Sequence, residues 1–450
     1  MTLRPLVFVL VASSCAAPAA RPSTESAAPA PSSPVAAATP APSAAALPVE
    51  PPFTTPTPPS ASPATSVAST DPVAVAPPAA STAGVGHDFI AEAMALYRVA
   101  ACGSKGDVPA RLDAAIVRAH CDELTHAYAE YERTWVDVAE PFIAALRPAD
   151  LPRVVVYPFG GGDLAGALAT FPDASEITTI SLEPAGDPRP IDTLTTDRLA
   201  RELGEHRAHL ERLFEKAHSR TDNLDKEAHT ELPGEIVFAL AALVVHRREP
   251  VALRYFRLSP DGAIDYVTQA DIAGAKSVAD RRALFTNAEL SFRAIGVPSA
   301  PVQVLRHIGY NLDDAHLAGD KSLLAHLDRK GKVAAMTKAA SHLLWSDHFS
   351  IIRGWLVAHT DWMISDSTGI PPRIAAPAHF AQDAYGTFAG PAGFGLIDAR
   401  DAADVKHLFD TQPHRDLPFR YGYPDGNGRS HLLVTRRVQG EATDAGAAHD

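Results

Sequence analysis

A 67-residue tract near the start of the chain limits how much of the chain can fold. Residues 16–82 hold 17 of the 39 prolines, and alanine, serine and threonine make up most of the rest. This composition offers almost no large apolar side chains, so burial cannot offset the entropy lost on ordering the chain. We expect a disordered, partly polyproline-like linker, which leaves about 350 of the 450 residues for folded structure.

The residues before this tract have the pattern of an export signal. Arg4 precedes the apolar run LVFVLVA, small residues follow, and the segment ends at Cys15. Ala12–Cys15 resembles the lipobox of bacterial lipoproteins, in which the cysteine is lipidated and becomes the new N-terminus. We predict a lipoprotein-type signal peptide over residues 1–15, with a soluble secreted protein as the alternative. Alanine at position 16, rather than aspartate, favours the outer membrane by resemblance to lipoprotein sorting. After such an anchor, residues 16–82 would serve as a spacer.

The charge balance bears on the partners of the chain. Its net charge is −13 and it contains no run of Lys or Arg, which argues against nucleic acid. No segment after the signal reaches 18 apolar residues, so we expect no further membrane span. The expected partners are the membrane, through the lipid anchor, and an unknown small molecule or envelope protein.

If Cys15 carries the anchor, Cys102 and Cys121 are the remaining cysteines. Two cysteines in an oxidising compartment can pair. The sequence between them, GSKGDVPARLDAAIVRAH, is compatible with a loop and a helix that bring them together. A disulfide and two buried thiols both remain open.

Hydrophobic periodicity indicates one globular domain over residues 83–437. Helical spacing predicts an N-terminal helical segment over 87–147, and strands alternate with helices over the α/β core at 151–437. RVVVYPF, GGGDLAGALATF and ITTISLEP read as strand, helix and strand within about 30 residues, the pattern of a parallel βαβ unit. We predict an α/β (or α+β) fold with a mixed, partly parallel sheet and a Rossmann-like βαβ unit. Residues 438–450 are expected to be a disordered tail.

Further elements follow from the same patterns. Helices are predicted for residues 192–217 and 234–247, and for KSLLAHLDRKG, VAAMTKAASHLLW and FSIIRGWLVAHT. PVALRYFRL, SPDG and AIDYVTQ predict a hairpin. Strands are also predicted at AELSFRAI, PVQVLRHIGYNL and DWMISDS, and LPFRYGY and SHLLVTR flank the turn PDGNGR.

Three segments resemble an uncharacterised family of exported bacterial proteins. YPFGGGDLAGALATFPDASEITTISLEPAG is similar to that family's pattern of aromatic-x-F-S-G-P-D-F, a helix, F-F-P-x-A, a strand and G-L-E-P-x-G. The matching residues are Phe159, Gly161, Asp163, Phe171, Pro172, Leu182, Glu183, Pro184 and Gly186. KAASHLLWSDHFSIIRGWLVAHTDWMISDSTGIP and FRYGYPDGNGRSHLLV are similar to its K-S-A-S-Y-L-L-H…N-F-S…D-D-S-G-I-P and G-Y…S-N-L-L-V. The resemblance spans roughly residues 87–435 and implies export, but it implies no reaction and no catalytic residue.

The turn formed by Gly160, Gly161, Gly162 and Asp163 is the first candidate site. With Glu183 ending the next strand, it resembles the nucleotide or S-adenosylmethionine site of doubly wound folds. However, the GxGxxG spacing is absent, Asp163 would cap the helix and repel a phosphate, and an exported domain meets few cytosolic cofactors. We therefore expect no cofactor. The turn is interpreted as structural first, as a ligand pocket second, and as a degenerate cofactor fold third.

Carboxylates at strand ends carry the catalytic hypothesis. Asp163, Glu183 and Asp366 are the candidate acid/base residues of an envelope hydrolase, which requires them to converge on one cleft within about 10 Å. The pair Asp163 and Glu183 could also bind a divalent cation. A helix cap and a turn-stabilising acid explain the same residues without chemistry.

Other motifs favour structural roles. Ser346-Asp347-His348 is better explained by an N-cap than by a nucleophile cluster. Asp366–Gly369 has one residue more than the Asp-Thr-Gly loop of aspartic proteases and is interpreted as a polar turn. His206 and His209 lie on a charged helix and are expected to be solvated. With no HExxH, CxxC, GxSxG or Walker loop, no metal site is predicted. The favoured function is a lipid-anchored cell-envelope protein whose domain binds a ligand or partner or is structural, and enzymatic activity is left open.

Overall fold

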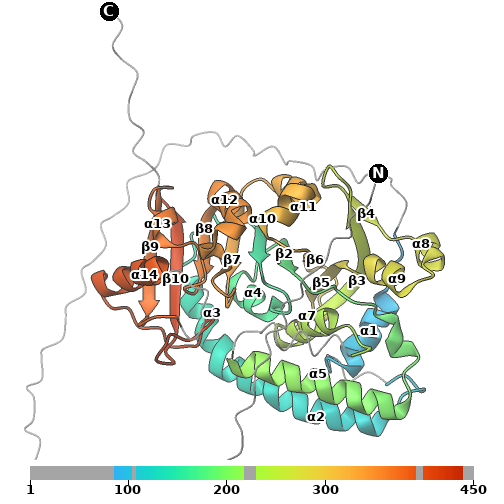
Figure 1. Cartoon of the computed structure of the whole chain (residues 1–450). Helices are drawn as coiled ribbons and strands as arrows, with labels where there is room; N and C mark the ends of the chain where they lie inside the picture. The colour runs from blue at the N-terminus through green and yellow to red at the C-terminus, as the bar shows by residue number, and fades with distance from the viewer. Residues whose placement is uncertain (1–85, 104–107, 217–229, 392–398, 439–450) are drawn as a thin grey trace, which may run out of the picture. The chain divides into compact units, whose positions relative to one another are not determined.

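The computed structural model describes residues 86–103, 108–216, 230–391 and 399–438. The predictions for the signal peptide, Cys15, the linker and the tail beyond residue 438 lie outside these ranges. Within them the chain forms a mixed α/β fold, with helices on both faces of a ten-stranded sheet (Figure 1). The predicted fold class is therefore confirmed.

The sheet has the strand order β4-β3-β5-β6-β2-β1-β7-β8-β10-β9. The strands are β1 Val154–Pro158, β2 Glu176–Ser181, β3 Arg248–Leu258, β4 Ile264–Tyr266, β5 Asn287–Ala294, β6 Gln303–Gly309, β7 Val333–Thr337, β8 Thr360–Ser365, β9 Phe380–Gly386 and β10 His431–Arg437.

The longer α-helices are α1 Ile90–Val99, α2 Ala114–Tyr131, α3 Asp137–Ala144, α5 Thr196–Lys216, α7 Gly234–Val245, α12 Ser350–His359 and α14 Ala399–Thr411. The shorter ones are α4 Leu164–Thr170, α8 Gln269–Gly274, α9 Val278–Leu284, α10 Asp314–Gly319, α11 Ser322–Asp328 and α13 Pro372–Ala375. A π-helical turn, η1 Glu132–Val136, joins α2 to α3, and 3-10 turns occupy η2 Arg189–Asp192, η3 Leu343–Trp345 and η4 Asp347–Phe349. Among the described residues no helix combines the length and the apolar character that a membrane span needs.

Five parallel strands form the centre of the sheet, in the order β6-β2-β1-β7-β8. From β1 the chain moves outward through β2 to β6, and it then returns to the other side of β1 to form β7 and β8. The direction of winding therefore reverses between β1 and β7. In doubly wound sheets, the crevice at the carboxyl ends of the strands beside such a reversal is where ligands bind.

Burial on both faces explains why the central strands are continuous apolar runs. In β1, Val155 and Tyr157 pack into the core beneath α4 and α7, whereas Val156 packs into the second core beneath α11 and α12. Both sides of the strand are thus removed from water, as expected for parallel strands covered by helices. The predicted βαβ unit is present as β1, α4 and β2, with Val155 paired to Ile177.

The prediction of a helix over VAAMTKAASHLLW was wrong. Val333–Thr337 is the buried strand β7, because Ala334 and Met336 face one core while Val333 and Ala335 face the other. Alanine and methionine favour helices locally, but here the segment pairs in parallel with β1 on one side and β8 on the other, and both of its faces are buried. Tertiary packing has overridden the local propensity.

Two further differences lie toward the C-terminus. LPFRYGY is not a strand, and β10 pairs instead with β8 on one side and with β9 on the other. The sequence patterns did not reveal β9. The edge of β9 is covered by the chain that follows α14, because Gln412 accepts a hydrogen bond from the Ala384 amide and donates one to the Gln382 carbonyl. Covering an edge strand in this way removes its unpaired backbone groups from other chains.

A covalent bond links the first two helices of the N-terminal helical segment. Cys102, just after α1, forms a disulfide with Cys121 of α2. Of the two alternatives left open by the sequence, the structure contains the disulfide. Helix α2 in turn lies alongside α5 at the lower edge of the view in Figure 1.

Candidate functional site

The glycine turn after β1 is shaped by close packing. A Cβ at Gly162 would approach the Phe238 ring to 2.9 Å, and its φ of +73° is one that other residues rarely adopt. A Cβ at Gly161 would collide with the side chain of Ser181 at the end of β2. Asp163 then caps α4 by accepting a hydrogen bond from the Gly166 amide at 3.1 Å. The glycines are therefore required by packing, and the helix start is already occupied by a carboxylate.

Asp163 also belongs to a buried ion pair. Its Oδ2 lies 2.6 Å from Nζ of Lys338, the residue that follows β7, and the two side chains are 5% and 1% exposed. The Tyr157 hydroxyl donates to the same oxygen at 2.8 Å. The pKa of Tyr157 is raised well above its usual value. Burial is the largest cause, and the charge of Asp163 is the next. The ion pair therefore bridges the point between β1 and β7 where the winding reverses.

Aromatic rings complete the surroundings of Lys338. Its Nζ lies 5.4 Å from the centre of the Trp135 ring and 5.8 Å from that of Tyr421. Trp135 sits in the π-helical turn η1 and is fixed by donating to the Arg420 carbonyl at 2.6 Å. Ring faces attract a cation most strongly where water is excluded, so the two rings add to the attraction that Asp163 exerts on the ammonium group.

The loop after Lys338 adopts a rare backbone conformation. Ala339, Ser341 and His342 have φ values of +54°, +48° and +57°. Such left-handed conformations cost of order 1–3 kcal/mol each for residues other than glycine, and they cluster at functional sites. Together with Phe159, at φ +61°, they line or adjoin the same cleft.

Asp366 holds this strained loop in place. One carboxylate oxygen accepts hydrogen bonds from the amides of Ala339 at 3.0 Å and Tyr423 at 2.8 Å, and the other accepts from the Thr368 amide at 2.9 Å and from the Thr368 hydroxyl. Asp366 is completely buried. Its position fits an anchor for the loop, and not an acid or base exposed to a substrate.

A cavity of about 130 Å³ opens between these elements. Among the three proposed catalytic carboxylates, Asp163 and Glu183 line it and Asp366 does not. Of the turn residues, Gly161 lines it, whereas Gly160 and Gly162 pack against Tyr157 and Phe238. The other lining residues are Tyr157, Phe159, Ser181, Leu182, Tyr310, Asn311, Leu312, Lys338, Ala339, Ala340, Ser341, Leu343, Phe349 and Tyr423.

The mouth of this cavity combines apolar rings with one unengaged acid. Phe159 and Phe349 meet edge to face with ring centres 5.7 Å apart, and Leu182 is 63% exposed beside them. Within the described part of the chain, the Glu183 carboxylate makes no hydrogen bond or ion pair. Glu183 is thus the acid that a ligand could reach.

A third buried acid lies behind the glycine turn. Glu235 of α7 is 6% exposed, with Oε2 3.6 Å from Nδ1 of His307. His307 donates from Nε2 to the Glu183 carbonyl at 2.9 Å, and burial lowers the pKa of His307 to about 4. The hydrogen bond from His307 holds the backbone of Glu183, just after β2, in place.

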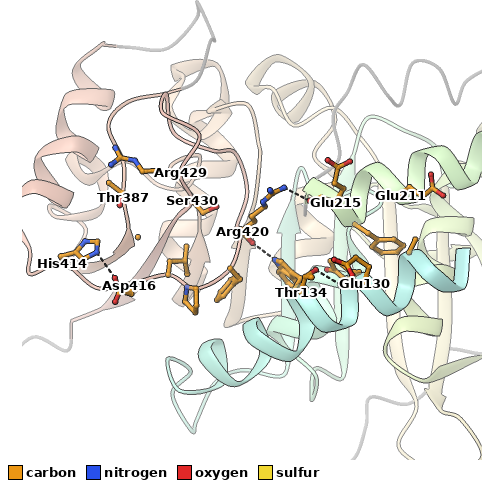
Figure 2. A pocket seen from close by; sticks show the side chains of 18 residues that line it. Glu130, Thr134, Glu211, Glu215, Thr387, His414, Asp416, Arg420, Arg429 and Ser430 are labelled. Atoms are coloured by element: carbon orange, nitrogen blue, oxygen red, sulfur yellow. Dashed lines mark hydrogen bonds and ion pairs between the residues drawn. The ribbon is translucent and has the colours of Figure 1, made fainter. Parts of the chain in front are cut away.

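A larger groove lies elsewhere, between α2, η1 and α5 on one side and the loops before β10 on the other (Figure 2). Its volume is about 1010 Å³, but several of its charged side chains pair with residues outside the groove, as Glu130 does with Arg133 and Arg429 with Asp425. His414 lies 3.1 Å from Asp416, and Arg420 donates to the Glu215 carbonyl at 3.1 Å. Because these groups do not converge on a common point, we assign the candidate site to the smaller cleft.

Several side chains of the cleft were not found from the sequence. Lys338 was missed because VAAMT was assigned to a helix. Read instead as a short apolar strand after Gly331, the same run would have placed Lys338 at a strand's carboxyl end. The expectation that His206 and His209 are solvated was wrong, since both are buried on the inner face of α5. Ser346 is an N-cap as expected, accepting from the His348 amide.

Comparison with known proteins adds no identity to these observations. No protein family, no curated protein and no solved structure matches this chain.

Proposed function

We propose that this domain binds a small, hydroxyl-bearing molecule without negative charge, in the cleft at the carboxyl ends of β1, β2, β6 and β7. The observation that carries the proposal is the cavity between the Asp163–Lys338 pair and Glu183, beside the reversal of winding in a doubly wound sheet. Ligand sites of open α/β sheets lie at this place.

The size and charge of the cleft define the ligand class. A volume of about 130 Å³ accommodates roughly ten water-sized groups, which is the size of a monosaccharide or a small amino alcohol. Asp163 and Lys338 compensate each other, so Glu183 leaves one net negative charge and disfavours phosphates. Hydroxyl and amide groups on Ser181, Asn311 and Tyr423 line the cavity together with the rings of Phe159 and Phe349, which suits a molecule with one polar and one apolar face.

Binding is favoured over the alternative of a carboxylate-dependent hydrolase. Asp163 is engaged by Lys338, Tyr157 and the Gly166 amide, and Asp366 by four donors. An acid/base mechanism needs two carboxyl groups able to exchange protons with a substrate. Glu183 alone meets that condition among the three candidates.

The test is a thermal-shift screen of the purified chain, followed by calorimetry. Monosaccharides, polyols and amino alcohols are compared with their phosphate esters. We expect at least one uncharged or cationic compound to raise Tm, while its phosphate ester does not. E183Q should weaken that binding at least tenfold without lowering Tm, and E215Q, an acid outside the cleft, should bind as the wild type does. No shift from any compound, or equal binding by E183Q, would rule the proposal out.

A second candidate function follows from the strand order. Numbered by their sequence within the core, the parallel strands run 3-2-1-4-5, which is the order of dinucleotide-binding sheets. We infer a nucleotide or S-adenosylmethionine type of scaffold in which the ion pair occupies part of the cofactor crevice. S-adenosylmethionine and NAD have more than twice the atoms that the cavity accommodates. Neither should raise Tm, and a clear stabilisation by either would show that the crevice still opens.

We further propose that the chain is exported and lipidated at Cys15, with the outer membrane as its destination. The sequence pattern around Cys15 and the composition of residues 16–82 support this. Mass spectrometry of the mature N-terminus should find a lipid-modified Cys15 as the first residue. An unmodified chain that begins after Cys15 would be inconsistent with the anchor.

A further inference from the structure

A cluster of two sulfurs and an imidazole lies in the N-terminal helical segment, away from the ligand cleft. Cys102 follows α1, and His120 and Cys121 are successive residues of α2. One ligand atom from each of the three residues lies within 4.8 Å of the other two. Thiolates and imidazole are the ligands that soft and borderline metal ions prefer.

His120 is already arranged as a metal ligand would be. Its Nε2 lies 2.9 Å from the Ala100 carbonyl, and because a carbonyl only accepts, Nε2 carries the proton. The lone pair is therefore on Nδ1, which is buried without a hydrogen-bond partner, in a residue that is 3% exposed. Metal-binding histidines typically donate their second ring N–H to a carbonyl in this way, which fixes the tautomer. An unsatisfied buried acceptor is otherwise costly.

We propose that Cys102, Cys121 and His120 form a redox-gated site for a thiophilic d¹⁰ cation, Zn²⁺ or Cu⁺. In the oxidised chain the disulfide occupies both sulfurs and the site is closed. A dithiol reductant donates two electrons and two protons, the S–S bond breaks, and the reductant becomes a disulfide. Each thiol then releases its proton to solvent as its sulfur binds the cation, whose oxidation state does not change.

The surroundings are compatible with this chemistry. Both cysteines are half-buried, so a reductant can approach them, whereas His120 is shielded. The nearby Arg207 is compensated by Glu123, 2.9 Å away, and does not add an unopposed positive charge. Two thiolates and one imidazole provide three ligands, which suits Cu⁺ directly and leaves a fourth position for Zn²⁺.

The experiment uses the full chain, reduced with a phosphine and desalted without oxygen, beside the oxidised chain. Zn²⁺ is titrated against a chromophoric chelator and Cu⁺ against bicinchoninate. We expect one equivalent of tight binding in the reduced chain, beyond what the oxidised chain and C102S/C121S bind. H120Q should weaken it at least tenfold, whereas H126Q, at an exposed histidine of the same helix, should leave it unchanged.

A second measurement reports on the thiols directly. Metal should slow alkylation of Cys102 and Cys121 by iodoacetamide in the reduced wild type more than in H120Q, while circular dichroism follows the fold. The proposal is overturned if the reduced chain binds no more metal than C102S/C121S. It is equally overturned if H120Q binds like the wild type, or if reduction alone unfolds the chain and so destroys the arrangement.

Discussion

At the scale of single residues, the Asp163–Lys338 pair is the most informative feature of this protein. Each side chain compensates a charge that would otherwise be buried alone beside the rings of Trp135 and Tyr421. Removing one partner of a buried ion pair is costly, whereas removing both together often is not. The pair therefore predicts strong coupling in a double-mutant cycle.

We expect D163N and K338M each to lower the free energy of unfolding by about 3–5 kcal/mol. The double variant should lose clearly less than the sum of the two single losses. Urea denaturation provides the measurement. E130Q, which breaks the exposed pair with Arg133, is the control and should cost less than about 1 kcal/mol. Additive losses would mean that the two charges do not stabilise each other.

Asp366 gives a second prediction at this scale. Asn at position 366 would place an amide N–H₂ against backbone donors, so D366N should lose at least about 3 kcal/mol of stability. It should also weaken ligand binding, because Ala339 and its neighbours would relax from their left-handed conformations. Chemical denaturation and calorimetry measure the two effects. A D366N chain of unchanged stability would contradict the anchoring role.

At the scale of elements, the disulfide joins α1 to α2 across a sequence separation of 19. Closing a loop of this length reduces the entropy of the unfolded chain, which raises the free energy of unfolding by about 3 kcal/mol at 25 °C. C102S/C121S should therefore unfold at a lower urea concentration, with a free energy of unfolding lower by about 3 kcal/mol. The change should disappear when wild type and variant are compared in reductant. A difference that persists in reductant would point to packing of the sulfurs.

The elements around the cleft contribute unequally to it. The end of β2 supplies Glu183, the β1–α4 turn supplies Asp163, and the loop after β7 supplies Lys338. The first two were predicted from the sequence because glycines and acids after short apolar runs are local signals. Lys338 was not, because the strand character of β7 depends on its neighbours β1 and β8.

At the scale of the whole molecule, buried neutral histidines make stability depend on pH. Burial is the largest cause that lowers the pKa of His307 and of His326 to about 4 in the folded chain, against about 6.5 when unfolded. As pH falls below 6.5, these two histidines bind protons in the unfolded chain but not in the folded chain. Stability is therefore fully present above pH 6.5 and declines from there toward pH 4.

The expected slope is about 1.4 kcal/mol per pH unit for each histidine. The free energy of unfolding, measured by urea denaturation from pH 7.5 to pH 4.5, should fall with this slope. In H326Q the slope should be smaller by the contribution of one histidine, about 1.4 kcal/mol per pH unit. The Gly262 carbonyl that His326 contacts at 3.0 Å can accept from the glutamine amide. A profile that is level between pH 6.5 and pH 5 would show that these histidines titrate normally.

The sequence by itself determined the α/β class, the βαβ unit and the glycine turn with its capping Asp163. These depend on periodicity, glycine and capping, which act over a few neighbouring residues. It also provided the predictions about Cys15 and residues 16–82, which rest on composition. Tertiary structure decided the strand order, the identity of β7 and the ion pair that closes the winding reversal. It also gave two of the candidate acids different roles. Glu183 lines the cavity, whereas the Asp366 carboxylate accepts hydrogen bonds from backbone amides. These outcomes depend on contacts between residues far apart in the sequence, such as Ala339 and Asp366, which are 27 positions apart, and Asp163 and Lys338, which are 175 apart. Over such separations, packing and burial outweigh local preference.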